Sequence, residues 1–319
     1  MAVIETLDIE QAEDFLGEIR RSHRRWIDPK DEAETLWMFR GQHDASLPLL
    51  PRAFRRQPNK VLDPLREDIA KHYASRNFRR HLGATASLVT CNDDQLAEAA
   101  LDALTHAGAV RLFMLLADEV RRPIVFSELL WHVFNEGRDE FRQYFAGETQ
   151  GKPEEVFAIA QHHGLPTQFL DWTLDPLIAA YFAADRADPT CSDRLAVWAL
   201  RRDLFNHQWA LSRFTVRAGA TPFLDAQAGL FTWSRRAYID RANRGRYIEF
   251  DELVQEASLG PPIAALGQPL LRKVTLPASR SDELLRLLWR ERVTPAHLMP
   301  TFDHVTMALE QKLRWLGTS

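Results

Sequence analysis

Arg40 is a strong candidate for binding chemistry, because it closes a short apolar run and is followed by Gly41 and Gln42. The run, at residues 36–41, favours a buried strand that ends in a turn. A guanidinium group at the end of such a strand needs a partner, since burying an unpaired charge is costly. Its planar fork of donors suits a phosphate or a carboxylate. We therefore expect Arg40 to hold either a bound anion or an internal Asp or Glu.

A second polar segment, residues 161–173, is predicted to run from a helix through a glycine stop and a proline turn into a short strand. It ends on Asp171, Trp172 and Thr173, just before a helix that opens at residue 175. The first N–H groups of that helix can be capped by Asp171 or Thr173, or can bind an anion. Trp172 suits the wall of a core or of a pocket.

Two further side chains have alternative interpretations. His163 precedes a glycine, where histidine often satisfies the end of a helix, but it can also face a ligand. Gln227 precedes a glycine and an apolar strand that contains Phe231. A buried glutamine rarely lacks hydrogen-bond partners. We expect Gln227 to bond either to a neighbouring loop or to a bound molecule.

The elements that must position these segments combine strands with helices. Helical patterns occupy residues 8–26, 154–164, 175–187 and 281–293, and strand-like runs occupy residues 36–41, 167–171, 195–200, 229–233 and 271–276. Residues from about 60 to 150 are almost wholly helical in pattern. Because regular strand–helix–strand repeats are few, we predict an α+β fold with a mixed sheet core and a large helical insertion.

The composition is that of an ordinary globular protein, with 319 residues, 45% hydrophobic residues and a net charge of −4. It excludes a disordered, collagen-like or disulfide-stapled chain. The two cysteines favour a reducing, cytoplasmic location. No run of 18 apolar residues is present, so we expect no membrane partner.

Several catalytic motifs are missing from the sequence. It contains no GxxxxGK[ST] loop, no GxGxxG after a strand, no HExxH and no GxSxG. The adjacent His162 and His163 point about 100° apart on a helix, so together they chelate a metal poorly. We therefore expect no metal and no acyl transfer.

The three segments together resemble the FRG domain family, which is named after its Phe-Arg-Gly motif. That motif occurs at residues 39–41, and residues 226–231 are similar to the family's aQxGxF-like motif. Residues 161–183, QHHGLPTQFLDWTLDPLIAAYFA, are similar to its second motif, QHxGLPTxLLDWTxxPxxAxxFA. The resemblance spans about residues 36–309. It implies an FRG domain at residues 31–319, with the helical insertion at about 60–150, after an N-terminal helix in residues 1–30.

A more distant resemblance is to ADP-ribosyltransferases of the Arg-Ser-Glu type. These carry an Arg on a first strand, a Ser-Thr-Ser strand before a helix, and a catalytic Glu on a later strand. The order of segments is similar here, which implies that fold for the sheet core and NAD as a substrate. Arg40 would grip the NAD pyrophosphate or the nicotinamide ribose, as a bidentate donor can. Thr173 would orient that Arg or the ribose, and Trp172 or Phe231 would stack on nicotinamide.

In this resemblance Gln227 stands where the family has its Glu. An amide can bond the ribose hydroxyl but brings no negative charge, and that electrostatic contribution is usually large in catalysis. Asp171 or Asp225 would then serve as the acid, or the reaction differs, or the domain binds a nucleotide without turnover. The implied catalytic residues are Arg40, Asp171, Thr173 and Gln227, and the implied NAD-binding residues are Arg40, Gly41, Gln42, His163, Trp172, Thr173 and Phe231.

Two classes of function stay open at this point. One is an NAD-consuming ADP-ribosyltransferase or glycohydrolase, such as a toxin or anti-phage effector, with a protein or nucleic acid as acceptor. The other is a module that binds a nucleotide or nucleic acid without catalysis. Residues 50–80 contain nine Lys or Arg against three acids, and residues 233–247 interleave arginines with aromatic residues. That pattern suits stacked single strands, and it equally suits a solvated basic surface.

Overall fold

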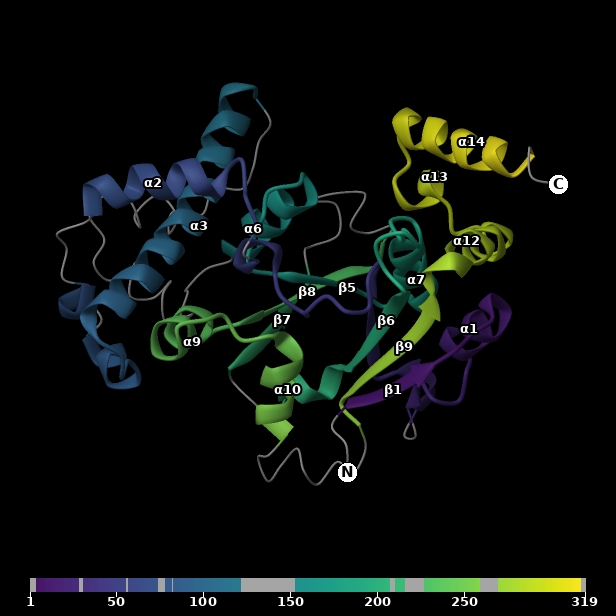
Figure 1. Cartoon of the computed structure of the whole chain (residues 1–319), viewed down its shortest axis with the longest axis horizontal. Coiled ribbons are helices and arrows are strands. Elements are labelled where there is room, and N and C mark those ends of the chain that lie inside the picture. Colours follow the sequence, from purple (N-terminus) through teal and green to yellow (C-terminus); the bar gives the residue numbers. More distant parts are fainter. Residues whose placement is uncertain are drawn as a thin grey trace.

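The computed structural model describes residues 4–28, 31–55, 57–73, 78–81, 83–121, 153–206, 210–215, 227–258 and 269–316. The protein is a mixed α/β protein built on a seven-stranded mixed sheet with the strand order β1-β9-β6-β4-β5-β8-β7 (Figure 1). Strands β1 and β9 are parallel, and the other neighbouring pairs are antiparallel. The bounds are Ile4–Asp8 (β1), Trp37–Gln42 (β4), Leu170–Thr173 (β5), Arg194–Arg201 (β6), Leu211–Phe214 (β7), Gly229–Ser234 (β8) and Leu271–Pro277 (β9), and β2 (Ile27–Asp28) pairs separately with β3 (Asp31–Thr35).

One face of strands β9, β6 and β4 is covered by helices α1 (Ala12–Ile19), α7 (Pro176–Ala184) and α12 (Ser281–Arg290). Successive strand residues point to opposite faces, so Phe39 packs with these helices while Met38 lies in the core on the other face. Helix α10 (Phe250–Ser258) covers that other face.

A third core lies at the other end of the sheet, where helices pack on Phe231 and Trp233 of β8. The helices of this core are α2 (Leu62–Tyr73), α3 (Asp93–Glu119), α6 (Pro153–His162) and α9 (Ala237–Arg244). Figure 1 shows α2 and α3 at the opposite end of the molecule from α12 and α14. The remaining elements are η1 (Arg52–Phe54), η2 (Phe78–His81), η3 (Gly83–Leu88), η4 (Arg202–Asn206), η5 (Ala278–Arg280), α13 (Pro295–Leu298) and α14 (Phe302–Leu316).

The helical stretch expected from about 60 to 150 contains α2 and α3 in its described part, and residues 122–152 lie outside the described residues. Helix α3 begins with a capping box between Asn92 and Gln95. It is long and apolar enough to cross a membrane, but 67% of its most apolar window is buried inside the protein. That degree of burial is typical of the core helix of a soluble protein, which explains its composition.

Two expected boundaries are corrected by the structure. The helix expected over residues 8–26 is limited to α1: Asp8 belongs to the edge strand β1, and the backbone leaves the helical conformation at Arg20, which has a ψ of 135°. The strand expected over residues 167–171 begins at Leu170 and continues to Thr173, so Asp171 lies within β5. Thr167 instead belongs to the preceding turn, where its hydroxyl donates to the side-chain oxygen of Gln161.

His106 of α3 is a buried histidine in an aromatic environment. Its ring centroid lies 5.6 Å from that of Phe54, 5.9 Å from that of Tyr238 and 6.5 Å from that of Tyr247. Burial lowers the pKa of His106 to about 4; nearby Asp102 opposes the shift and Arg66 adds to it. The ring is therefore neutral in the folded protein at pH 7.

This burial predicts a pH-dependent stability. As the pH falls below about 6.5, the unfolded chain binds a proton at His106 that the folded chain does not, so the free energy of unfolding decreases until about pH 4. Between pH 7 and pH 5 we expect His106 to account for a loss of ~2 kcal/mol. Urea unfolding of wild type and His106→Gln at both pH values measures this. Equal losses in the two proteins would contradict the prediction.

Candidate functional site

The candidate site lies where β4 and β5 separate. Strand β4 pairs with β6 along all six residues, but its Cα pairing with β5 is limited to Phe39 and Thr173. In the gap that follows, Nη1 of Arg40 donates to the backbone carbonyl of Asp171 at 2.7 Å and to its Oδ2 at 3.2 Å. The Arg40 side chain is 15% exposed and the Asp171 side chain 60%. The structure thus brings together the Arg and one of the acids that the sequence singled out.

Asp171 is held from a second side by the end of helix α6. The amide nitrogen of Gln161 donates to Oδ1 of Asp171, and the hydroxyl of Thr167 donates to the amide oxygen of Gln161. Helix α6 ends here because Gly164 has a φ of +93°, a backbone conformation that favours glycine. The turn between Gly164 and β5 therefore orients the carboxylate of Asp171.

Two more arginines converge on the same place from the segment after β4. Nη1 of Arg52 donates to the carbonyl of Gly164 at 3.3 Å, and Nε of Arg55 donates to the carbonyl of Leu50 at 3.0 Å. The pKa of Arg55 is lowered, first by burial and then by the charges of Arg40 and Arg52, while Asp171 partly offsets them. The three guanidinium groups are thus close enough for the charges of Arg40 and Arg52 to act on Arg55, and among the described residues Asp171 is paired with Arg40. Such a concentration of positive charge attracts an anion.

Histidines border this arginine cluster. Burial lowers the pKa of His162, and the neighbouring His163 adds to the shift while Asp171 opposes it. Burial also lowers the pKa of His43, with Asp44 opposing and Arg186 and Arg55 contributing. Both rings are therefore neutral near pH 7.

His163 points elsewhere. It is exposed, and its ring lies near parallel to that of Phe113, with the centroids 6.3 Å apart.

Thr173 and Gln227 form a neighbouring structural contact. The hydroxyl of Thr173 donates to the backbone carbonyl of Gln227 at 2.7 Å and accepts from the backbone N–H of Asp175 at 3.0 Å. The N-cap of α7 is Asp175, whose Oδ1 accepts from the N–H of Leu177 at 2.8 Å. This corrects the expectation that Asp171 or Thr173 caps the helix. The side chain of Gln227 is directed to the carbonyl of Leu298, at 3.5 Å.

Three other predicted binding residues have structural partners. Trp172 is buried in the core under α10, where its Nε1 donates to the hydroxyl of Thr232 at 2.8 Å. The amide nitrogen of Gln42 donates to the carbonyl of Leu47 at 2.7 Å, and its oxygen accepts from Nε1 of Trp198 at 2.6 Å. Gly41 faces the backbone of α7.

Phe231 lies directly beside the site. It is opposite Asp171 in the β5–β8 register, but its ring is buried and stacks on Phe214 with the centroids 5.2 Å apart. Asp225, the other acid considered, lies outside the described residues.

Five residues of the site had no role predicted from the sequence: Arg52, Arg55, His43, Gln161 and Thr167. The first three lie between β4 and α2, in a segment whose path depends on tertiary contacts and whose single short element among the described residues is η1. Gln161 and Thr167 had a usable signal, because both belong to the polar motif that surrounds Asp171.

The basic run at residues 235–246 is largely neutralised by acids. Its ion pairs join Arg236 to Asp240, Arg241 to Asp102, Arg244 to Glu256 and Arg246 to Glu252. The interleaved Trp233 and Tyr238 are buried, so their rings do not form a platform for bases. These contacts favour the Arg40 cluster over this run as the binding site.

Fold and site together define a mixed α/β protein with an arginine-rich polar site at the split between two central strands. Residues 116–191 match the family model of the FRG domain. The match confirms the resemblance indicated by the motif at residues 161–183, and it includes Gln161, Thr167 and Asp171 but not Arg40. No curated protein and no solved structure matches the chain.

Proposed function

We propose that the arginine cluster binds the diphosphate of a nucleotide and that the protein is an ADP-ribosyltransferase-like enzyme with NAD as its substrate. The observation that carries the proposal is the grouping of Arg40, Arg52 and Asp171 around Arg55, whose pKa responds to all three charges, with Arg40 paired to Asp171. These four groups have a net charge of +2, which complements the two negative charges of a diphosphate. Charge-assisted bonds from arginine to phosphate are among the stronger hydrogen bonds in proteins.

The remaining donors of Arg40 support this assignment. Its hydrogen bonds to Asp171 use Nη1, and within the described residues neither Nε nor Nη2 has a hydrogen-bond partner. A guanidinium group in this state can donate to a phosphate oxygen without giving up its internal contact. Arg40 can therefore hold the internal carboxylate of Asp171 and a bound anion at the same time. From the sequence alone these two partners were alternatives.

Asp171 is the acid we assign to the chemistry. The bond between nicotinamide and the ribose C1 breaks, and neutral nicotinamide leaves with the electron pair. The oxygen of water or an acceptor group bonds to C1 and loses a proton to solvent. A carboxylate near C1 stabilises the positive charge that develops on the ribose. Gln227 cannot supply that charge, and its described contacts are with Thr173 and Leu298.

A second candidate is nucleotide binding without turnover. It is favoured by the contacts of Asp171, because both of its carboxylate oxygens already accept hydrogen bonds, one from Gln161 and one from Arg40. A carboxylate held in this way serves to orient Arg40 as well as to stabilise charge. Catalysis and binding then differ in whether nicotinamide is released.

Asp171→Asn separates the two candidates. We expect this change to lower nicotinamide release from NAD by about 100-fold, since it removes the stabilising charge. The affinity for ADP-ribose is expected to stay within about threefold of wild type, because the arginines remain. Release is measured with and without cell lysate as a source of acceptor, and binding by calorimetry.

The matched control is Glu10→Gln, which removes an exposed carboxylate paired with Arg194. It should behave as wild type. ADP-ribose binding without nicotinamide release by the wild type would establish the binding module instead. If the wild type neither binds ADP-ribose nor releases nicotinamide, the proposed function is overturned.

A further inference from the structure

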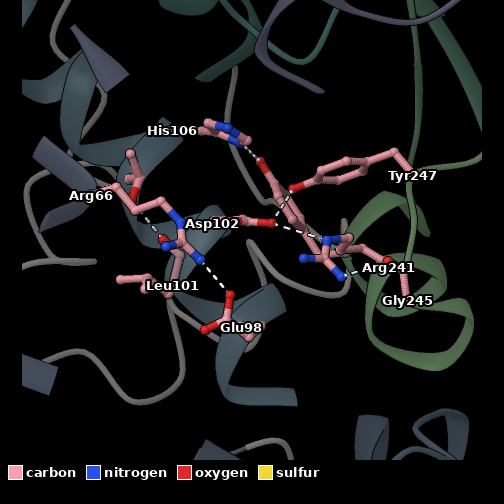
Figure 2. Close-up of polar contacts among 10 residues, drawn as sticks. Arg66, Glu98, Leu101, Asp102, His106, Arg241, Gly245 and Tyr247 are labelled. Carbon is pink, nitrogen blue, oxygen red and sulfur yellow. Dashed lines mark hydrogen bonds and ion pairs between the residues drawn. The ribbon is translucent and has the colours of Figure 1, made fainter. Parts of the chain in front are cut away.

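Asp102 of α3 ties together several parts of the helical core. Its Oδ1 accepts from Nε of Arg66 in α2 at 3.1 Å, and its Oδ2 accepts from Nε of Arg241 in α9 at 3.2 Å and from the hydroxyl of Tyr247 at 3.1 Å (Figure 2). The side chain is 14% exposed. A carboxylate with three such partners fixes their positions relative to α3.

Tyr247 extends this restraint to residues 52–55, the arginine segment, which carries Arg52 and Arg55. Its ring stacks on Phe54 with a centroid distance of 3.9 Å and an interplanar angle of 5°. Phe54 stands between Arg52 and Arg55 in the chain, close to both guanidinium-bearing residues. The Asp102–Tyr247 bond therefore holds the aromatic anchor of the segment that supplies two of the three arginines.

His106, one turn further along α3, reaches the same segment and also the other side of the site. Its ring centroid lies 5.6 Å from that of Phe54. Its Nδ1 lies 3.0 Å from the hydroxyl oxygen of Tyr238, and that hydroxyl donates to the side-chain oxygen of Gln168 at 2.8 Å. Gln168 follows Thr167, whose hydroxyl holds Gln161 and through it Asp171.

The two sides are also joined directly to each other. The backbone N–H of Ala53 donates to the carbonyl of Thr167 at 3.2 Å. One helix thus restrains both the segment that carries Arg52 and Arg55 and the turn that orients Asp171. None of these restraints involves a side chain of the arginine cluster.

We propose that helix α3 positions the arginine cluster through two polar arms, Asp102–Tyr247 on the arginine segment and His106–Tyr238 on the turn before β5. The proposal rests on the proposed function for its effect on ligand binding. These four side chains are positioning residues, because they act on the site through Phe54 and Gln168.

Each arm can be cut by removing one hydroxyl group while the ring stays. Tyr247→Phe breaks the bond to Asp102 but keeps the ring stacked on Phe54. We expect the affinity for both inorganic pyrophosphate and ADP-ribose to fall about fivefold, with kcat for nicotinamide release unchanged. Tyr238→Phe breaks the bond to Gln168, and we expect kcat to fall about fivefold with pyrophosphate affinity unchanged.

The matched control is Tyr181→Phe. Its hydroxyl donates to Asp185, the residue after α7, at 3.0 Å, and its ring is buried, so this variant also loses one hydrogen bond while keeping a buried ring. A loss of overall stability alone would give the same result in all three variants. A positioning role is distinguished by the contrast between the variants, because Tyr247→Phe is expected to lower affinity alone and Tyr238→Phe to lower kcat alone.

Amide hydrogen exchange tests the arms without any ligand. We expect exchange of the Ala53 and Phe54 amides to be about tenfold faster in Tyr247→Phe, and exchange at residues 168–170 to be about tenfold faster in Tyr238→Phe, relative to Tyr181→Phe. Exchange equal to that of the control in both variants would overturn the positioning role. Failure of the wild type to bind ADP-ribose would overturn the proposed function instead, while exchange still decides the role of α3.

Discussion

Arg40→Gln is expected to weaken ADP-ribose binding by about 100-fold, since charge-assisted bonds to a partly buried arginine contribute ~2–3 kcal/mol. The change removes the guanidinium fork, and it also removes the bonds that hold the backbone and side chain of Asp171. Calorimetric titration with ADP-ribose measures the effect. Nicotinamide release should fall at least as far.

Two further variants make the Arg40 result specific. Arg20→Gln removes a surface arginine paired with Glu291 and should bind as wild type. Arg40→Lys keeps the charge but loses the planar fork, so we expect it to recover only a small part of the affinity. Wild-type affinity in Arg40→Gln would contradict the placement of the anion at this site.

Gly41→Ala is expected to cause the largest loss of stability. A Cβ at this position would lie 2.0 Å from the carbonyl oxygen of Ala179 and 2.7 Å from the backbone nitrogen of Ala183. Both atoms belong to the backbone of α7, so relief requires β4 and α7 to move apart within a packed core. We expect a loss of at least ~3 kcal/mol in the free energy of unfolding, measured by urea denaturation.

The control for this substitution is Gly17→Ala in α1. A Cβ at Gly17 has no atom within 4 Å, and alanine is the better helix former. We expect that variant to be as stable as wild type or up to ~1 kcal/mol more stable. Equal unfolding midpoints for Gly41→Ala and wild type would show that β4 and α7 are not packed as described.

The sequence predicted the elements whose signals are local. The apolar run at residues 36–41 became β4, and Gly164 ended α6 because its positive φ favours glycine. The helix α14 was not predicted, because many of its large apolar residues are exposed and leave no clear stripe facing a core. Strand β1 was missed because it is short and forms the edge of the sheet, where its partner β9 lies far along the chain.

The site was predictable only in part, for a similar reason. Arg40 and Asp171 stand in motifs whose residue types indicate polar chemistry, and they meet across the gap between β4 and β5. Arg52 and Arg55 belong to the segment around η1, whose position depends on the contacts of Phe54 with α3 and with Tyr247. The spacing of residues in the sequence does not predict such tertiary contacts.

The most direct test of the central claim is a crystal structure of the protein with ADP-ribose bound. We expect diphosphate oxygens within about 3 Å of the Arg40 guanidinium, with Arg52 and Arg55 facing the same anion. The ribose that carries the reacting carbon should lie beside Asp171. A diphosphate bound away from Arg40, or an empty cluster in crystals saturated with ADP-ribose, would contradict the account.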